Sequence, residues 1–259
     1  MRLTFLGTGT STGVPSLACH CRVCTSPDPH DKRTRPSLLI EFDGRAVVID
    51  TAPDFRQQAL REGLQRLDAV LFTHTHADHI FGLDDVRPFN YRQGAPIPIY
   101  ADCRSMESLR RIFAYVFEGT YPHGGIPRLD PHLIEGPFEL WGERMIPLKV
   151  LHGDLPVLGF RFRDAAYVTD FSVIPEETVP LLEGLDVLIL AALRHKPHPA
   201  HSTLEQSVAW VERLKPRRAY FTHMAHELGH EETNATLPSH VRLAYDGLKL
   251  KLGNDEREP

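Results

Sequence analysis

Short apolar runs alternate with polar, glycine-rich or proline-rich segments along most of this chain. Apolar runs of this length, bounded by turn residues, predict β-strands. They lie at residues 3–6, 37–42, 45–49, 69–72, 97–101, 146–151, 159–163, 166–169, 186–191 and 218–222, and within 241–252. Asp43-Gly44, between two of these runs, predicts a tight hairpin turn.

Three segments instead space their apolar residues as a helix does, at residues 55–63, 105–116 and 203–214. The third begins with Ser202 or Thr203 as its cap and has Glu205 or Gln206 near the position that completes a capping box. Residues 118–137 are rich in loop-forming residues and predict a flexible lid. Interspersed strands and helices predict an α/β fold.

Composition narrows the class of protein. The 259 residues are 42% hydrophobic and 24% charged, enough for one large α/β domain or two small ones. A net charge of −5 without a basic run argues against binding to long nucleic acid. The first apolar run is too short for a signal peptide, and no apolar stretch is long enough to span a membrane. We therefore expect a cytoplasmic enzyme with no membrane partner.

The fourth apolar run leads directly into His74-Thr75-His76-Ala77-Asp78-His79. Four potential ligands in six residues cannot share one face of a strand or helix, but on a turn they can converge from two directions. Imidazole and carboxylate together suit zinc, manganese or iron. The motif therefore predicts a site for two metal ions.

Ligand-type residues also end other strands, namely Asp50, His152, Asp170 and His223. In open α/β sheets the loops at one end of the strands meet and form the ligand site. These residues are therefore expected to join the histidine motif at one edge of the fold.

A second metal-binding pattern is Cys19-x-Cys21-x-x-Cys24. In a cytoplasmic protein it predicts three ligands of a tetrahedral zinc site rather than disulfides. The fourth ligand is open between His20, His30 and a distant histidine. His226-Glu227-Leu228-Gly229-His230 matches the metalloprotease pattern, but Gly229 weakens the required helix, so we interpret the match as accidental.

Together, in their order along nearly the whole chain, these motifs resemble the metallo-β-lactamase superfamily. The resemblance implies one domain over residues 1–259, an αββα sandwich of two mixed sheets flanked by helices. Within the superfamily the chain is similar to the phosphoribosyl cyclic phosphodiesterases of phosphonate degradation. Beyond the metal motifs, the matching residues are Gly7-Thr8-Gly9, Gly13-Val14-Pro15, the cysteine triplet and Thr222-His223-Met224-Ala225-His226. Relatives in pyrroloquinoline-quinone biosynthesis share the cysteine pattern but depart from the full histidine motif.

The resemblance also implies roles for single residues. His74, His76 and His152 would hold one metal, Asp78, His79 and His223 the second, and Asp170 both, while Asp50 would orient a ligand histidine. The implied cofactors are two divalent ions, manganese or zinc with iron as a further option. One structural zinc would be held by Cys19, Cys21, Cys24 and His226, in an N-terminal zinc-binding loop at about residues 15–35.

The implied reaction is hydrolysis of a small cyclic phosphodiester, of the ribose type, by a metal-bound hydroxide. Asp78 and His201 would be catalytic, His201 as general acid for the leaving oxygen. Substrate contacts are assigned to Arg87, Asn90, Arg194 and His195. The expected partner is this small anionic substrate, and a homodimer is left open.

Three rival functions remain. The first is tRNA 3′-end processing, which would need a basic, glycine-rich arm that the sequence does not show. The second is lactone, thioester or β-lactam hydrolysis in the same fold. The third is a non-catalytic accessory role in biosynthesis, against which the complete ligand set argues.

Overall fold

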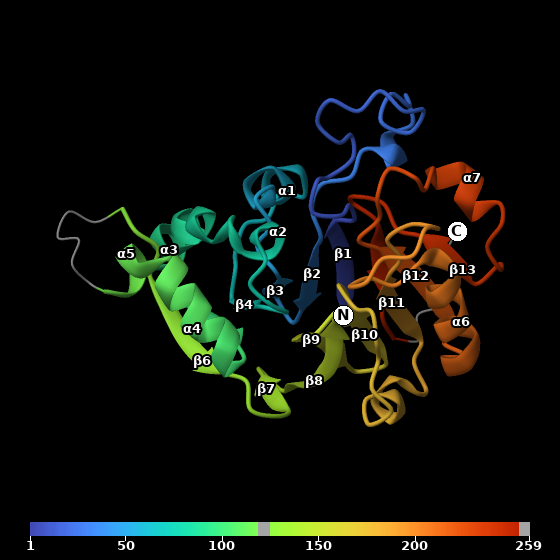
Figure 1. The fold of residues 1–259 in the computed structure, drawn as a ribbon. Coiled ribbons are helices and arrows are strands. Elements are labelled where there is room, and N and C mark those ends of the chain that lie inside the picture. The colour runs from blue at the N-terminus through green and yellow to red at the C-terminus, as the bar shows by residue number, and fades with distance from the viewer. Residues whose placement is uncertain (119–124, 254–259) are drawn as a thin grey trace.

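Two β-sheets of seven strands pack face to face, and helices cover their outer faces (Figure 1). The structure is a computed structural model, which describes residues 1–118 and 125–253. The arrangement confirms the predicted αββα sandwich of two mixed sheets.

The first sheet is built mainly from the N-terminal half of the chain. Its strands, in spatial order, are β14 (Lys249–Lys251), β1 (Arg2–Gly7), β2 (Ser37–Phe42), β3 (Arg45–Ile49), β4 (Ala69–Leu71), β5 (Ile97–Ala101) and β6 (Leu129–Leu133). Strands β3 to β6 run parallel, whereas the β14, β1, β2 and β3 pairings are antiparallel. The last strand of the described chain thus completes the sheet that the first strand begins.

The second sheet comes from the C-terminal half. Its order is β13 (Val241–Leu243), β12 (Arg218–Thr222), β11 (Val187–Ala191), β10 (Ala165–Val168), β9 (Leu155–Phe162), β8 (Glu143–His152) and β7 (Phe138–Leu140). Strands β10 to β13 are parallel, and β7 to β10 are joined as antiparallel neighbours.

The helices are short and mostly follow strands. They are α1 (Phe55–Arg61), α2 (Ala77–Ile80), α3 (Arg87–Gln93), α4 (Cys103–Ile112), α5 (Ala114–Phe117), α6 (Leu204–Leu214) and α7 (His230–Asn234), with 3₁₀ turns η1 (Pro29–Asp31), η2 (Leu83–Val86) and η3 (Val179–Leu182). In α6, Thr203 and Gln206 form the predicted capping box. Among the described residues, none of the helices is long and apolar enough to cross a membrane.

Alternating side chains divide the core into layers. Val47 and Ile49 of β3 join Phe160 and Ile189 of the second sheet in a buried cluster between the sheets. The intervening Val48 faces outward, into the cluster that includes helix residues of α1 and α4. Period-two alternation in strands therefore supplies one apolar face to the partner sheet and the other to the helices.

Three predictions about elements need correction. The segment 118–137 contains the edge strand β6, and residues 119–124 of the predicted lid lie outside the described residues. The helix predicted at 105–116 breaks at Phe113 into α4 and α5. The apolar residues of 241–252 form β13 and β14, which belong to different sheets.

Candidate metal centre

Side chains at the ends of five strands converge at one edge of the sandwich. Asp50 follows β3, His74 follows β4, His152 ends β8, Asp170 follows β10 and His223 follows β12. Three of them have left-handed backbones, with φ of 62° at Asp50, 44° at Asp170 and 55° at His223. The left-handed conformation turns the chain sharply where each of these strands ends. It is energetically unfavourable for residues other than glycine, and such strained residues cluster at functional sites.

The structure brings the predicted ligands into overlapping groups. Each residue contributes one potential ligand atom to its group, and the ligand atoms of a group all lie within 4.8 Å of one another. The groups are His74 with His76 and His152, Asp78 with His79 and His223, and His74 with His79 and Asp170. Every residue predicted for the two-metal site therefore belongs to one connected cluster.

Asp170 contacts His79 and His223 of one histidine group and also groups with His74 of the other. Its Oδ2 is 3.2 Å from His79 Nε2, and its Oδ1 is 3.1 Å from His223 Nε2. Because the same carboxylate also groups with His74, it touches residues predicted for both metals. This is the position that a bridging ligand requires.

Hydrogen bonds to the far side of the rings fix the orientation of the histidines. Asp50 Oδ2 accepts from His79 Nδ1 at 2.7 Å, and the backbone oxygen of Ala200 accepts from His152 Nδ1 at 2.6 Å. Each bond leaves Nε2 with its lone pair toward the cluster. Asp50 makes the contact that its predicted role requires, and that role stays a prediction, whereas the backbone oxygen of Ala200 leaves no signal in sequence.

Thr73 was also missed. Its backbone N–H and its hydroxyl both donate to Asp50, at 2.8 and 2.7 Å. A threonine before a histidine motif is an ordinary strand residue, so only its contacts reveal that it supports Asp50.

The electrostatic field of the cluster favours positive charge. Burial would lower the pKa of His79, yet the carboxylates of Asp170, Asp78 and Asp50 raise it well above its usual value. Burial likewise opposes ionisation of Asp78, but His79 and His223 hold the pKa of this carboxyl well below its usual range. At His74 burial dominates, and with the charge of His79 it lowers the pKa.

The donor set fits divalent metal ions. The Nε2 atoms of His74, His79 and His223 are buried and have no hydrogen-bond partner among the described residues. Leaving a buried polar atom unpaired costs about 1–3 kcal/mol, so three such atoms together call for a ligand. Imidazole nitrogens beside carboxylates suit zinc, manganese or iron.

His201 lies at the same cluster, as predicted. Its ring stacks on His223 with centroids 4.9 Å apart, and its Nδ1 is 3.7 Å from Asp170 Oδ1. Burial, with the nearby charge of His223, lowers the pKa of His201 to about 3. The imidazole is therefore neutral at pH 7 in the absence of a bound anion.

The cysteine triplet forms a second, separate group with His226. The Sγ atoms of Cys19, Cys21 and Cys24 lie 3.1, 3.4 and 3.3 Å from His226 Nδ1. Ligand atoms of a tetrahedral zinc site with sulfur and nitrogen ligands are about 3.5 Å apart. Of the candidates left open by sequence, the structure thus selects a distant histidine.

Buried polar contacts attach this cysteine loop to the segment that carries His226. Arg33, whose side chain is fully buried, donates to the backbone oxygens of Ala225 and Leu228 at 3.2 and 2.6 Å. Asp246 accepts from the backbone N–H groups of Thr8 and Thr34, and also from their hydroxyls. Neither Arg33 nor Asp246 carries a sequence motif that singles it out.

The residues predicted to bind substrate have other partners in the structure. Asn90 requires a correction, because its buried amide bonds to Ala95 and to the backbone of Arg128, and it therefore supports structure. Arg87 pairs with Asp84 at 2.7 Å, and His195 with Glu205 at 2.6 Å. Arg194 lies 3.6 Å from Glu227, so substrate contacts of Arg87, His195 and Arg194 stay predictions.

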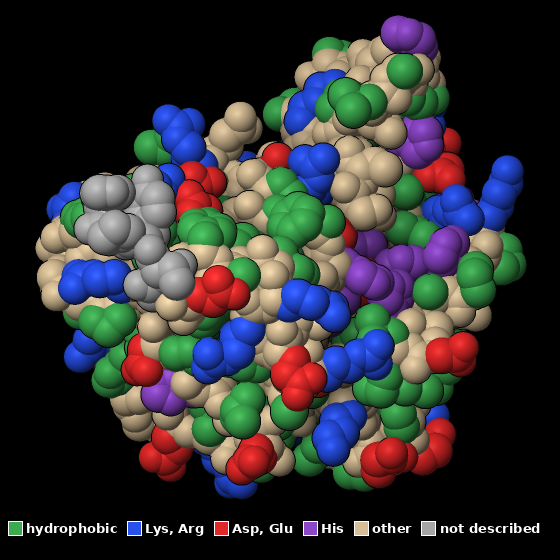
Figure 2. All heavy atoms as spheres, turned by 60° about the vertical axis from the view of Figure 1, so that its left-hand side comes forward, with side chains coloured by type: hydrophobic (Ala, Val, Ile, Leu, Met, Phe, Trp, Pro, Cys, Tyr) green, Lys and Arg blue, Asp and Glu red, His purple; other side chains and the backbone are tan. Residues whose placement is uncertain are grey.

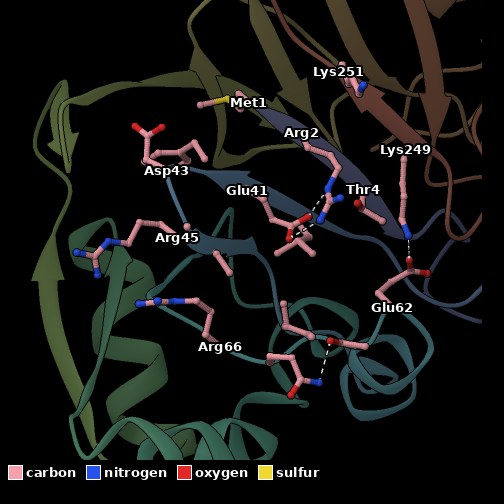
Figure 3. A pocket seen from close by; sticks show the side chains of 17 residues that line it. Met1, Arg2, Thr4, Glu41, Asp43, Arg45, Glu62, Arg66, Lys249 and Lys251 are labelled. Carbon is pink, nitrogen blue, oxygen red and sulfur yellow. Dashed lines mark hydrogen bonds and ion pairs between the residues drawn. The ribbon is translucent and has the colours of Figure 1, made fainter. Parts of the chain in front are cut away.

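Histidine side chains gather at a hollow beside the protruding N-terminal loop (Figure 2). Another cavity, of about 700 Å³, lies along the first sheet, and none of the predicted metal ligands lines it (Figure 3). Its charges are largely paired, with Arg2 on Glu41 at 2.8 Å and Lys249 on Glu62 at 3.0 Å. The predicted metal ligands therefore lie apart from this cavity.

Known proteins share both the sequence and the fold of this chain. It is 41% identical over 253 residues to an octanoyltransferase of Porphyromonas gingivalis. The matched region makes up 96% of this chain but only 51% of the octanoyltransferase. A crystal structure of a diphosphatase of the PhnP family is 50% identical, with a TM-score of 0.92 over 97% of this chain and 98% of that one. The chain spans about half the length of curated relatives that it matches, such as this octanoyltransferase.

More distant structures show the fold alone. Zinc-bound PqqB from Methylobacterium extorquens is 19% identical with a TM-score of 0.82, covering 97% of this chain and all of that one. The short form of human tRNase Z is 20% identical with a TM-score of 0.72, covering 98% of this chain and all of that one.

The fold and the diphosphatase neighbour together support a metal-dependent hydrolase. The family model of the beta-lactamase superfamily domain matches residues 45–224, which contain the whole histidine and aspartate cluster. The chain therefore belongs to the beta-lactamase superfamily, in its metallo-β-lactamase fold.

Proposed function

We propose that this chain is a dinuclear-metal phosphodiesterase acting on a small, ribose-type cyclic phosphate. The observation that carries the proposal is the position of Asp170, which lies 3.2 Å from His79 and 3.1 Å from His223 of one histidine group and also groups with His74 of the other. A shared carboxylate between two histidine groups suits a pair of ions held close together, as in enzymes of phosphoryl transfer. The diphosphatase of the PhnP family, 50% identical, supports the same class of chemistry.

His74, His76 and His152 would hold one ion, and Asp78, His79 and His223 the other, with Asp170 common to both. When bound, the two ions would supply an activated water and neutralise the phosphate oxygens. Manganese, zinc and iron all fit this donor set. The cysteine site would hold a structural zinc, because all four of its ligands come from the protein and no position is left open.

His201 would act on the leaving oxygen. Its ring lies between His152 and His223, at centroid distances of 4.4 and 4.9 Å, so it borders both metal groups. A phosphodiester anion bound beside the imidazole favours its charged form and raises its pKa. The protonated ring would then donate its proton to the departing alkoxide.

A diphosphate bond is a second candidate substrate. The specific observation is the diphosphatase activity named for the 50% identical structure. The same two-metal site can stabilise charge on either a diester or a diphosphate, so the site geometry does not choose between them. The pocket loops, including Arg194 and His195, would make the choice.

The rival functions have less support. tRNase Z is only 20% identical to this chain, and a similarity at that level shows a shared fold alone. The octanoyltransferase is about twice as long as the matched region, so its name assigns no activity to this chain. If the chain hydrolyses lactones or thioesters, it should turn over acyl substrates. If it has only an accessory role, it should turn over no substrate. The assay below tests both. The partner that we propose is a small anionic substrate, and the proposed location of the protein is the cytoplasm. Whether the chain forms a homodimer is left open.

The test is metal analysis followed by an assay of the loaded protein. Two ions at the histidine site and one at the cysteine site are expected, with hydrolysis of a ribose cyclic phosphate and of bis(p-nitrophenyl) phosphate. Hydrolysis of a nucleoside diphosphate but neither diester would favour the second candidate. Turnover of thioesters or lactones alone, or of no substrate with both metals bound, would overturn the proposal.

A further inference from the structure

A second pair of histidines lies outside the sites described above. His30, in η1, and His230, the first residue of α7, are far apart in sequence, yet their ring centroids are 4.6 Å apart. One nitrogen of each ring and a carboxylate oxygen of Glu231 all lie within 4.8 Å of one another. The sequence suggested other roles for both histidines, His30 as a ligand beside the cysteines and His230 in the metalloprotease pattern.

The structure excludes both of those roles. His226 occupies the position beside the cysteines that His30 was a candidate for. Gly229 is extended, with φ −67° and ψ 136°, so α7 begins only at His230, and His226 and His230 do not share one helix. Neither histidine is therefore used in the role that the sequence suggested, and the two can bind one ligand together.

His230 has an unused ligand atom in a buried position. The residue is 5% exposed, and its Nδ1 has no hydrogen-bond partner among the described residues. Burial, together with the charge of His30, lowers the pKa of His230 to about 4. At neutral pH the ring is therefore uncharged and keeps a lone pair for a cation.

Neighbouring contacts hold both rings in place before any ion arrives. Tyr245 stacks on His30 with centroids 4.1 Å apart, and the backbone N–H of His230 donates to Asp31 Oδ1 at 2.9 Å. Asp28 Oδ1 is 3.7 Å from His30 Nδ1 and adds negative charge. Because the two rings are already ordered, binding loses little side-chain conformational entropy at the histidines.

We propose that His30, His230 and Glu231 bind a further divalent transition-metal ion of the zinc class. Two imidazoles and one carboxylate are a common protein ligand set for zinc, with water completing the coordination. Since Glu231 is exposed, the ion would exchange with solvent, unlike an ion in the cysteine site. It would join η1 of the cysteine loop to α7, two segments from opposite ends of the chain.

In the experiment, zinc is titrated into protein that already carries its tightly bound ions, and calorimetry measures the heat of binding. Wild type should show one further binding event. Glu231→Gln and His30→Gln should each weaken this event by more than about tenfold, because even residues that only support metal ligands contribute that much. Glu231→Gln removes one charge from an exposed side chain, so the fold should be retained.

Glu232→Gln is the matched control. It removes the same charge from the neighbouring exposed residue, which pairs with Arg22 instead. Binding should stay within about twofold of wild type, a change smaller than that expected for loss of a metal-supporting contact. Absence of a further event in wild type would overturn the proposal. So would a further event that persists unchanged in Glu231→Gln and His30→Gln, because that ion would lie elsewhere, for example at the other exposed histidines.

Discussion

His79 Nδ1 lies 2.7 Å from Asp50 Oδ2, and neither side chain is exposed to solvent. The carboxylate accepts a hydrogen bond from Nδ1–H, so Nε2 is the ring nitrogen that faces Asp78 and Asp170. The orientation of a ring in α2 is thus set by the residue that follows β3.

The first prediction concerns Asp50→Asn. Asparagine tolerates the left-handed backbone at this position, where φ is 62°, so the change isolates the loss of charge. The affinity for the active-site metals should fall about 10–100-fold, as when other outer-shell partners are removed. Metal retained against a graded series of chelator concentrations measures it. Asp43→Asn makes the same change at another left-handed residue, in the hairpin turn, and should retain metal normally. Equal retention in the two variants would contradict the role of Asp50.

The second prediction concerns His201→Ala. If the imidazole donates a proton to the leaving oxygen, kcat should fall at least about 10²-fold while metal content is unchanged. Steady-state kinetics and metal analysis on the same sample measure both quantities. His132→Ala is the control, because that ring lies in β6, pairs with Asp130 and belongs to none of the predicted metal or substrate sets. Metal lost in parallel with activity would show that His201 supports metal binding instead.

The third prediction concerns the cysteine site. Cys21→Ser should release one zinc and lower the free energy of unfolding by about 2.7 kcal/mol or more, the value for a ligand at 100 times its Kd. For a chain of this size, that corresponds to a fall in Tm of roughly 5–10 °C. Thermal unfolding with metal analysis measures it. Cys103→Ser is the control, since Cys103 is exposed and lies outside the group. Unchanged zinc content in Cys21→Ser would refute the site.

The fourth prediction concerns Asp68 and the pH dependence of stability. Burial would raise the pKa of Asp68, but hydrogen bonds from Arg66, Arg45 and the backbone of Ala46 lower it. A depressed pKa stabilises the fold above the unfolded value of about 3.9, and the contribution is lost as pH falls through the folded pKa. Asp68→Asn should cost about 1–2 kcal/mol at pH 7.

The cost should shrink as pH falls from about 4 through the lowered pKa of the folded protein, because Asp68 is protonated first in the unfolded chain and then in the folded protein as well. Urea unfolding at a series of pH values measures the difference between the two proteins. Glu176→Gln, which breaks an exposed pair with Arg213, should change stability by less than about 1 kcal/mol at any pH. A cost for Asp68→Asn that is independent of pH would rule out the charge as its source.

Local signals explain why much of the fold was predictable. The Asp43-Gly44 turn needs left-handed backbone, with φ of 46° and 72°, and few other dipeptides supply it. The capping box of α6 is a similarly local rule. The clustering of the candidate metal ligands was predictable for a different reason. They follow strands, and strand ends meet wherever parallel strands share a sheet.

Contacts made across the fold were not predictable. Asn90 resembles a solvated polar residue in sequence, and only the approach of the loop at Arg128 shows that its amide is buried. β6 was missed because its sequence, Leu129–Leu133, is interrupted by Pro131 and is paired on one side by β5 alone. The meeting of His30 with His230 depends on how η1 packs against α7, which no local pattern encodes.

The pairing of β14 with β1 has a consequence for synthesis on the ribosome. β1 is synthesised long before β14, so the edge of β1 that pairs with β14 is filled only when Lys249–Lys251 have been made. Asp246, which accepts from Thr8 and Thr34, arrives equally late. Until then the growing polypeptide carries an open strand edge, the kind of surface that pairs with other chains. We therefore expect the nascent protein to depend on shielding during translation, and chains truncated before residue 246 to aggregate rather than accumulate in folded form.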